Sequence, residues 1–113
     1  MARRSVILVP SGEAVIKVGS LAAASSSTEQ ALGQYQVFAV IGIRPTTSTS
    51  IATTGFHIKF GRTGMPAAAA TDMFLPPGQL VTLDTGSAFT HVRFFNPHAT
   101  EAIDIYVLPL ITN

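Results

Sequence analysis

Residues 79–110, QLVTLDTGSAFTHVRFFNPHATEAIDIYVLPL, decide the fold class of this chain. They contain three runs rich in β-branched and aromatic residues, Gln79–Thr85, Ala88–Phe95 and Glu101–Leu110, and the breaks between these runs hold glycine and proline. Short runs of this kind, separated by turn residues, are typical of successive strands in an all-β protein. The stretch therefore predicts an all-β fold made of short strands.

The residues before this stretch continue the pattern. Phe56, Ile58 and Phe60 alternate with His57 and Lys59, which predicts a half-buried strand with a polar outer face. A glycine-rich loop over 61–70 and a short extended segment over 71–75 follow. Pro76-Pro77-Gly78 then predicts a turn, because proline fixes φ and glycine tolerates positive φ.

The N-terminal half is less regular. Strands are predicted at Ser5–Val9, Ala14–Val18 and Tyr35–Ile43. The last of these is apolar on both faces, which is typical of a central strand. The segment Ser20–Gln34 is rich in alanine and serine, and we expect a loop with one helical turn there. Together the segments predict a jelly-roll-like antiparallel β-sandwich of about eight strands.

The chain length predicts one domain over residues 1–113, with residues 1–4 as a short N-terminal arm. The period-2 pattern places one set of side chains on inward strand faces. In an adjacent aromatic pair, one ring should lie in the core and the other should form a second core layer or an interface anchor; the pair here is Phe94 and Phe95. The predicted core residues are Phe56, Ile58, Phe60, Leu80, Val92, Ile103, Ile105 and Val107.

Charged residues make up only 12% of the chain and hydrophobic residues 47%, against about 25% charged in an average domain. A lone monomer would therefore present an unusually apolar surface to water, and we expect other protein, including copies of the chain itself, to cover part of it. A homotrimer is the first expectation and a dimer the second. No apolar run reaches the ~18 residues of a membrane span, and no export signal is expected.

The composition and the motifs also limit the binding and catalytic functions that the chain can have. A net charge of +1 without a basic cluster argues against nucleic-acid binding. The absence of cysteine excludes disulfides. The three histidines, His57, His91 and His98, lack metal-ligand spacing, and no serine lies in a Gly-x-Ser-x-Gly motif. Gly61-Arg62-Thr63-Gly64 matches no phosphate-binding loop. We expect no enzyme activity, no metal and no cofactor.

Five segments between Phe56 and Leu108 form a pattern of strand, alanine-rich loop, Pro-Gly turn, strand and strand. They are Phe60-Gly61-Arg62, Pro66–Met73, Leu75–Gly78, Thr90–Arg93 and Ala102–Ile105. The pattern resembles the C-terminal half of small β-sandwich decoration, or cement, proteins on the capsids of tailed bacteriophages.

The resemblance implies a structural protein on the virion surface, made in the host cytoplasm, that clamps neighbouring capsid subunits. A tail, head-fibre or spike-base component and a small glycan- or ligand-binding β-module stay open as alternatives. We expect partner contacts from the arm Met1–Ser5 and from the charge-free loop Pro45–Gly55. The candidate partner-binding residues in these two segments are Arg3, Arg4, Thr46, Thr47 and Thr49.

Overall fold

The computed structural model describes residues 8–10, 15–33, 35–43, 55–86 and 88–112, which contain ten β-strands and no helix. The all-β prediction is confirmed. The strands are β1 (Leu8–Pro10), β2 (Ile16–Leu21), β3 (Ser25–Ser26), β4 (Gln30–Ala31), β5 (Val37–Ile43), β6 (Phe56–Gly61), β7 (Met73–Leu75), β8 (Val81–Asp84), β9 (His91–Asn96) and β10 (Ile103–Thr112).

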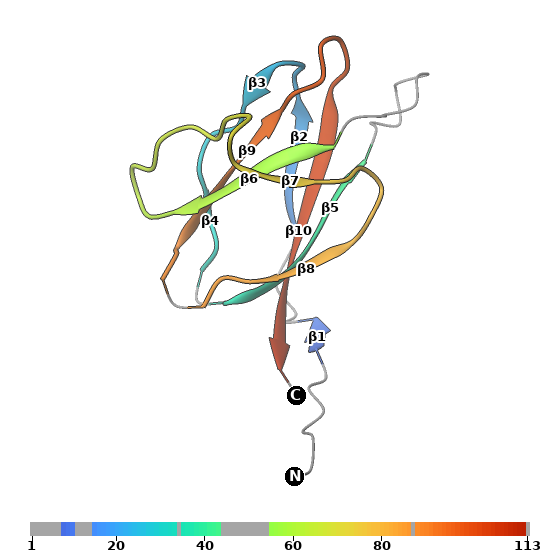
Figure 1. Ribbon diagram of the computed structural model, residues 1–113. Helices are drawn as coiled ribbons and strands as arrows, with labels where there is room; N and C mark the ends of the chain where they lie inside the picture. The colour runs from blue at the N-terminus through green and yellow to red at the C-terminus, as the bar shows by residue number, and fades with distance from the viewer. Residues whose placement is uncertain (1–7, 11–14, 34, 44–54, 87, 113) are drawn as a thin grey trace.

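The strands form two antiparallel sheets that pack face to face (Figure 1). Sheet A has the order β2-β10-β5-β8, and β1 pairs with the far end of β10. Sheet B has the order β7-β6-β9, and both β3 and β4 pair with the free side of β9. With β3 and β4 counted as one interrupted strand, these are the two four-stranded sheets of a jelly roll.

β10 is the longest strand and organises sheet A. It pairs with β5 from Asp104 to Leu110, and its other side is shared between β2 and β1. Pro109 lies between the part of β10 that pairs with β2 and the part that pairs with β1. Proline has no N–H to donate to a ladder, so it fits a position where one neighbouring strand has ended and the next has not begun.

The core lies between the sheets, and the rings of Phe38, Phe56 and Phe94 are fully buried in it. Phe56 and Phe94 meet edge to face with centroids 5.9 Å apart, a favourable aromatic geometry. Phe95 points to the outer face of sheet B, where it lies against His57. Six of the eight predicted core residues are buried: Phe56, Ile58, Val92, Ile103, Ile105 and Val107.

The other two predicted core residues differ. Phe60 is only partly buried, although it packs against the core. Leu80 is 65% exposed, so its assignment to the core is wrong. β8 begins at Val81, the residue after Leu80. Its inward side chains are Val81 and Leu83. Pairing with β5 sets this register, with Val81 opposite Val40 and Leu83 opposite Phe38.

The expectation of a loop with a helical turn over Ser20–Gln34 is also wrong for the described residues of that segment, which hold the end of β2 and the short strands β3 and β4. The interruption between β3 and β4 is built on Ser27. Its backbone N–H donates to Phe94 O at 2.8 Å, and its Oγ accepts from Phe94 N at 3.0 Å. The buried hydroxyl therefore replaces a backbone acceptor, and pairing with β9 overrides the local helix preference.

Candidate functional site

The five predicted partner-binding residues, Arg3, Arg4, Thr46, Thr47 and Thr49, lie outside the described residues, as do the arm Met1–Ser5 and most of the loop Pro45–Gly55. Their assignment stays a prediction.

Each of the three histidines has its own structural partner. His57 Nδ1 lies 2.9 Å from Asp72 O and donates to it, on the outer face of sheet B as the alternation predicts. His91 Nδ1 lies 2.8 Å from Thr90 Oγ1, and its Nε2 lies 3.6 Å from Glu29 Oε2. The described part of the chain contains no group of three or more metal-ligating side chains.

The outer face of sheet B is covered by the loop between β6 and β7, residues 62–72. Met65 and Ala68 of this loop are buried. Arg93 on β9 donates from Nη1 to Met65 O at 3.1 Å, and Lys59 on β6 lies 3.6 Å from Asp72 Oδ1. These basic groups hold the loop against the sheet. They are part of the scaffold and do not form an anion site.

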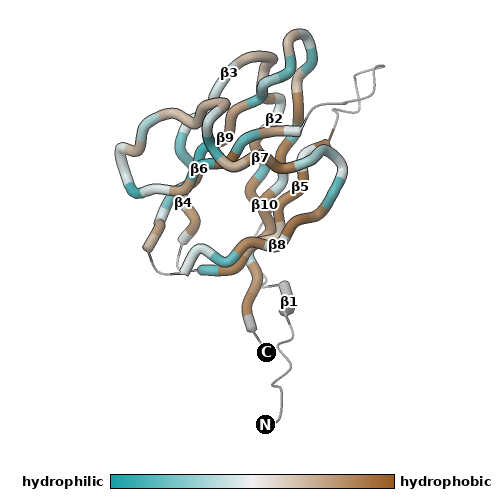
Figure 2. The backbone as a smooth tube through the Cα atoms, in the orientation of Figure 1, coloured by the Kyte–Doolittle hydropathy of each residue, from teal (hydrophilic) through white to brown (hydrophobic). Residues whose placement is uncertain are grey.

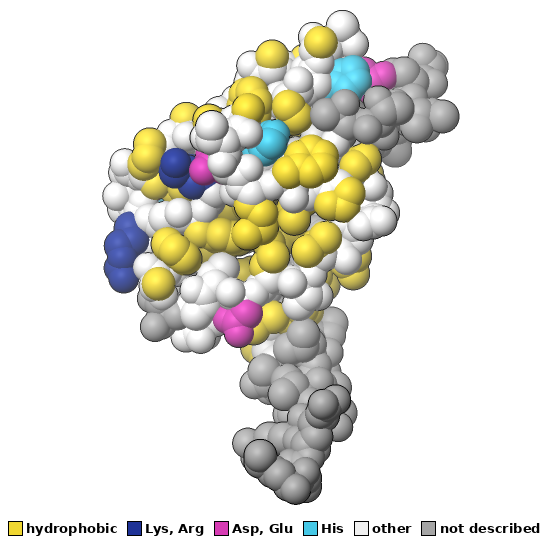
Figure 3. Space-filling view, in the orientation of Figure 1, with side chains coloured by type: hydrophobic (Ala, Val, Ile, Leu, Met, Phe, Trp, Pro, Cys, Tyr) yellow, Lys and Arg dark blue, Asp and Glu magenta, His cyan; other side chains and the backbone are white. Residues whose placement is uncertain are grey.

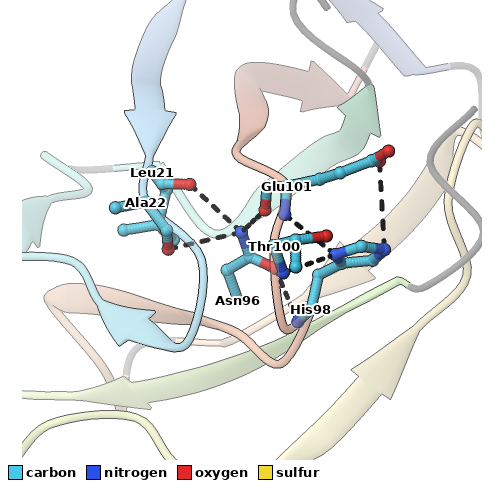
Figure 4. A network of polar contacts seen from close by, with 6 residues as sticks. All are labelled: Leu21, Ala22, Asn96, His98, Thr100 and Glu101. Atoms are coloured by element: carbon cyan, nitrogen blue, oxygen red, sulfur yellow. Dashed lines mark hydrogen bonds and ion pairs between the residues drawn. The ribbon is translucent and has the colours of Figure 1, made fainter. Parts of the chain in front are cut away.

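One edge of the sandwich, beside β2 and β3, is closed by a polar network around Asn96 (Figure 4). Asn96 is 1% exposed, and its Nδ2 donates to Leu21 O at 3.1 Å and to Glu101 O at 2.8 Å. Its Oδ1 accepts from His98 N at 3.0 Å. Because β2 belongs to sheet A and β9 to sheet B, this amide ties the two sheets together.

The connection after β9 is held by His98. Its Nδ1 accepts from Thr100 N at 3.1 Å and from Glu101 N at 2.9 Å. An imidazole nitrogen that accepts two N–H groups carries no proton itself, so the ring proton is on Nε2. Nε2 lies 3.9 Å from Glu101 Oε2. The network therefore fixes a turn. Among the described residues, Glu101 Oε2 is buried without a hydrogen-bond partner.

The opposite edge of the sandwich, between β7 and β8, is open and apolar. Five side chains lie along this opening, and we call them the open-edge patch: Phe60, Met73, Val81, Leu83 and Phe89. Met73 is 53% exposed and Phe89 40% exposed, and Phe89 stacks on Phe60 with ring centroids 6.0 Å apart. Figure 3 shows hydrophobic side chains gathered over β6, β7 and β8, around a hollow in the surface.

The open edge also presents unpaired strand edges. β7 pairs with β6 alone and β8 with β5 alone among the described strands. Phe74, on the outer face of β7, is 51% exposed and lies against His57 with ring centroids 5.3 Å apart. An exposed strand edge beside large apolar side chains is the arrangement that accepts another polypeptide segment.

Comparison with known protein families, curated protein sequences and solved structures finds no match to this chain. In the described residues there is no helix of the length and hydropathy that a membrane crossing needs. The open-edge patch is therefore the candidate functional site on its own geometry.

Sequence reasoning did not identify this patch. Met73 ends the alanine-rich segment Pro66–Met73 and Phe89 lies in the strand predicted at Ala88–Phe95, and neither pattern predicts an exposed apolar patch. The low overall charge indicated that apolar side chains would be exposed somewhere, but it did not indicate where. Their positions depend on β7 and β8 both being edge strands, which is a property of the topology.

Proposed function

We propose that this protein is a non-enzymatic structural component of a virion, a homo-oligomer that binds the capsid surface and clamps neighbouring capsid subunits. The observation that carries the proposal is the open-edge patch, where Met73 and Phe89 are about half exposed beside the free edges of β7 and β8. The low charge of the chain and its resemblance to capsid decoration proteins support the same function.

A protein segment suits this patch better than a sugar or other small polar ligand. Phe60 and Phe89 stack on each other at an interplanar angle of 29°, so part of their ring surface is unavailable to a sugar ring. The exposed strand edges offer N–H and C=O groups in the spacing of another strand. Main-chain pairing would supply affinity, and the apolar side chains beside it would supply specificity.

Clamping would act by mass action. A protein that binds only the assembled lattice stabilises that lattice by about 4 kcal/mol per site when its free concentration is a thousandfold above its Kd. This mechanism needs a rigid scaffold with an adhesive surface. It does not need a reacting group, in keeping with the structural partners of the three histidines.

The direct test is the composition of purified particles. Virions purified from a lysate of the host that carries the coding sequence should contain the protein at a fixed ratio to the major capsid protein. Electron microscopy with a specific antibody should place it on the capsid. Labelling confined to the tail would favour the tail or fibre alternative, and absence of the protein from particles would contradict the proposal.

Rebinding to particles stripped of the protein tests the patch. Met73→Lys should reduce rebinding at least tenfold, because it places a charge in the apolar contact. Ala99→Lys is a matched control, since residue 99 is exposed in the connection between β9 and β10; it should rebind as wild type. Equal binding by both variants would remove the patch from the mechanism.

The N-terminal arm gives an independent prediction. Deleting residues 1–4 removes Arg3 and Arg4, which we expect to form charge-assisted pairs with acidic capsid residues. The truncated chain should bind stripped particles more weakly, while its Tm in thermal unfolding stays within about 2 °C of wild type. Binding by the truncated chain at wild-type affinity would show that the arm takes no part in attachment. The open-edge patch and the loop Pro45–Gly55 would then be the attachment surfaces.

A further inference from the structure

The outer face of sheet A is apolar along its two central strands. The cross-strand pairs on this face are Tyr106 with Ile41, Leu108 with Ala39 and Leu110 with Val37, and Ile43 lies opposite Asp104. Figure 2 shows β5 and β10 coloured largely as hydrophobic. The outer face of a solvated antiparallel sheet is normally polar. We call this set the platform: Val37, Ala39, Ile41, Ile43, Tyr106, Leu108 and Leu110.

The platform is separate from the core. The inward side chains of the same strands, such as Phe38, Val40 and Ile105, belong to the core cluster of described residues, and no platform residue does. Five of the seven platform residues are half-buried rather than buried. Sheet B differs, because the loop over residues 62–72 covers its outer face with Met65 and Ala68.

Three charged side chains of the described residues lie on this face. Asp104 on β10 is 8% exposed and lies opposite Ile43, and the two exposed ones, Lys17 and Asp84, lie on a diagonal. Lys17 on β2 lies beside Tyr106, with Nζ 5.7 Å from the centre of its ring. Asp84 on β8 pairs with Val37 at the other end of β5. In the strand order β2-β10-β5-β8, these two residues occupy opposite corners of the platform.

This arrangement is complementary to itself. If a second copy is turned over about a twofold axis that runs along the other diagonal, Lys17 of each copy lies over Asp84 of the other. Strands of the two copies then cross at about 90°, which is one of the two common angles for packed sheets. An interface of this kind uses the same patch on both copies. The net charge of +1 adds little repulsion between them.

The area of the platform is sufficient for a weak dimer. Four strands spaced about 4.8 Å apart and six residues rising about 3.4 Å each cover roughly 400 Å² per copy. Two copies would bury roughly 800 Å² in total, below the about 1,200 Å² of a stable specific interface and in the range of weak, transient contacts. We therefore expect reversible association in the micromolar range.

We propose that the platform is the interface between two copies of this chain, packed face to face about a twofold axis with Lys17 of each copy opposite Asp84 of the other. The inference rests on the self-association in the proposed function and does not depend on capsid binding. It replaces the homotrimer expected from composition with a twofold dimer. Its test needs only the purified chain.

Sedimentation velocity from about 1 to 100 μM provides the test. Wild type should pass from monomer to dimer in this range. Lys17→Glu and Asp84→Lys should each raise the dimer Kd about tenfold. The twofold dimer contains two Lys17–Asp84 contacts, so either substitution creates two pairs of like charges. The double variant should return to within about threefold of wild type. Arg62→Glu makes the same change in net charge as Lys17→Glu, on an exposed loop, and it should leave the Kd unchanged.

Two further variants test the apolar contact of the proposed dimer interface. Ile41→Lys should abolish dimerisation, and Ile41→Thr, which keeps a β-branched side chain suited to a strand, should weaken it at least fivefold with the Tm preserved. A wild type that stays monomeric at 100 μM, or that forms a trimer, would overturn the proposal. So would a dimer that Ile41→Thr leaves intact, or one in which the charge reversals have no effect. Normal capsid binding by a monomeric chain would overturn the dimer and the homo-oligomer of the proposed function, and leave only its capsid binding standing.

Discussion

At the scale of single residues, Asn96 shows how a polar side chain can hold an apolar sandwich together. It is buried, yet its amide satisfies carbonyls from Leu21 and Glu101 and an N–H from His98. Nothing in the local sequence Phe95-Asn96-Pro97 distinguishes this role from that of an ordinary turn asparagine. The residue could be predicted as part of a turn, but its contact with β2 depends on a partner 75 residues away.

Asn96→Ala should therefore lower the free energy of unfolding by about 3 kcal/mol, since it leaves several buried polar groups without partners. Urea unfolding followed by circular dichroism measures the loss. Thr100→Ala is the control: its side chain is exposed and only its backbone N–H contacts His98, so its effect should stay within about 0.5 kcal/mol. A similar small loss for Asn96→Ala would show that the network contributes little to stability.

Gly42 is a second residue whose role only the packed structure reveals. A Cβ at this position would lie 2.5 Å from Cε1 of Phe56, on the facing sheet. Gly42→Ala should cost about 1–3 kcal/mol by overpacking. In the double variant with Phe56→Leu, the smaller side chain makes room for the new Cβ. The double variant should therefore lose less free energy of unfolding than the sum of the two single losses. Strict additivity in urea unfolding would show that the ring moves aside without strain.

At the scale of elements, strands were predictable where both faces gave a clear pattern, and registers were not. β6 follows the alternation of Phe56, Ile58 and Phe60, and β5 is central as its two apolar faces indicate. β8 could not be placed in the same way. In the run Gln79–Thr85, Leu80 and Val81 point to opposite faces, and the choice between them is made by pairing with β5.

The two faces of β8 can be distinguished by substitution. Leu83 packs against the core, whereas Leu80 is 65% exposed. Leu83→Ser should therefore cost about 1–2 kcal/mol through lost burial, and Leu80→Ser less than about 0.5 kcal/mol. Both are measured by urea unfolding. The reverse order of the two losses would show that β8 is shifted by one residue relative to β5.

β3 and β4 could not be predicted at all. Each has two residues, and the alanine- and serine-rich segment around them favours a loop or helical turn locally. Pairing with β9 and the buried hydroxyl of Ser27 decide their conformation. Contacts across about 65 residues therefore overrule local propensity here.

At the scale of the whole molecule, two separate surfaces carry groups of apolar side chains that the fold leaves exposed or half-buried. The open-edge patch faces out between β7 and β8, and the platform covers the outer side of β5 and β10. The low charge of the chain predicted that such surfaces exist. In the function proposed above, one surface binds a second copy and the other binds the capsid, and their separation makes the two contacts compatible.

A covalent crosslink tests the whole dimer at once, because the chain has no cysteine of its own. In the variant Lys17→Cys, Asp84→Cys, each thiol should lie opposite its counterpart on the other copy. A short bis-maleimide linker should then give a band at twice the 11.9 kDa of the chain on denaturing gels. Packed sheets lie about 10 Å apart, which is too far for a disulfide, so a linker of about that length reports register as well as contact. Arg62→Cys, Asp84→Cys is the control, because Arg62 lies on the loop of sheet B, and it should crosslink only slowly through random collision. Equal rates for the two variants would contradict the diagonal arrangement.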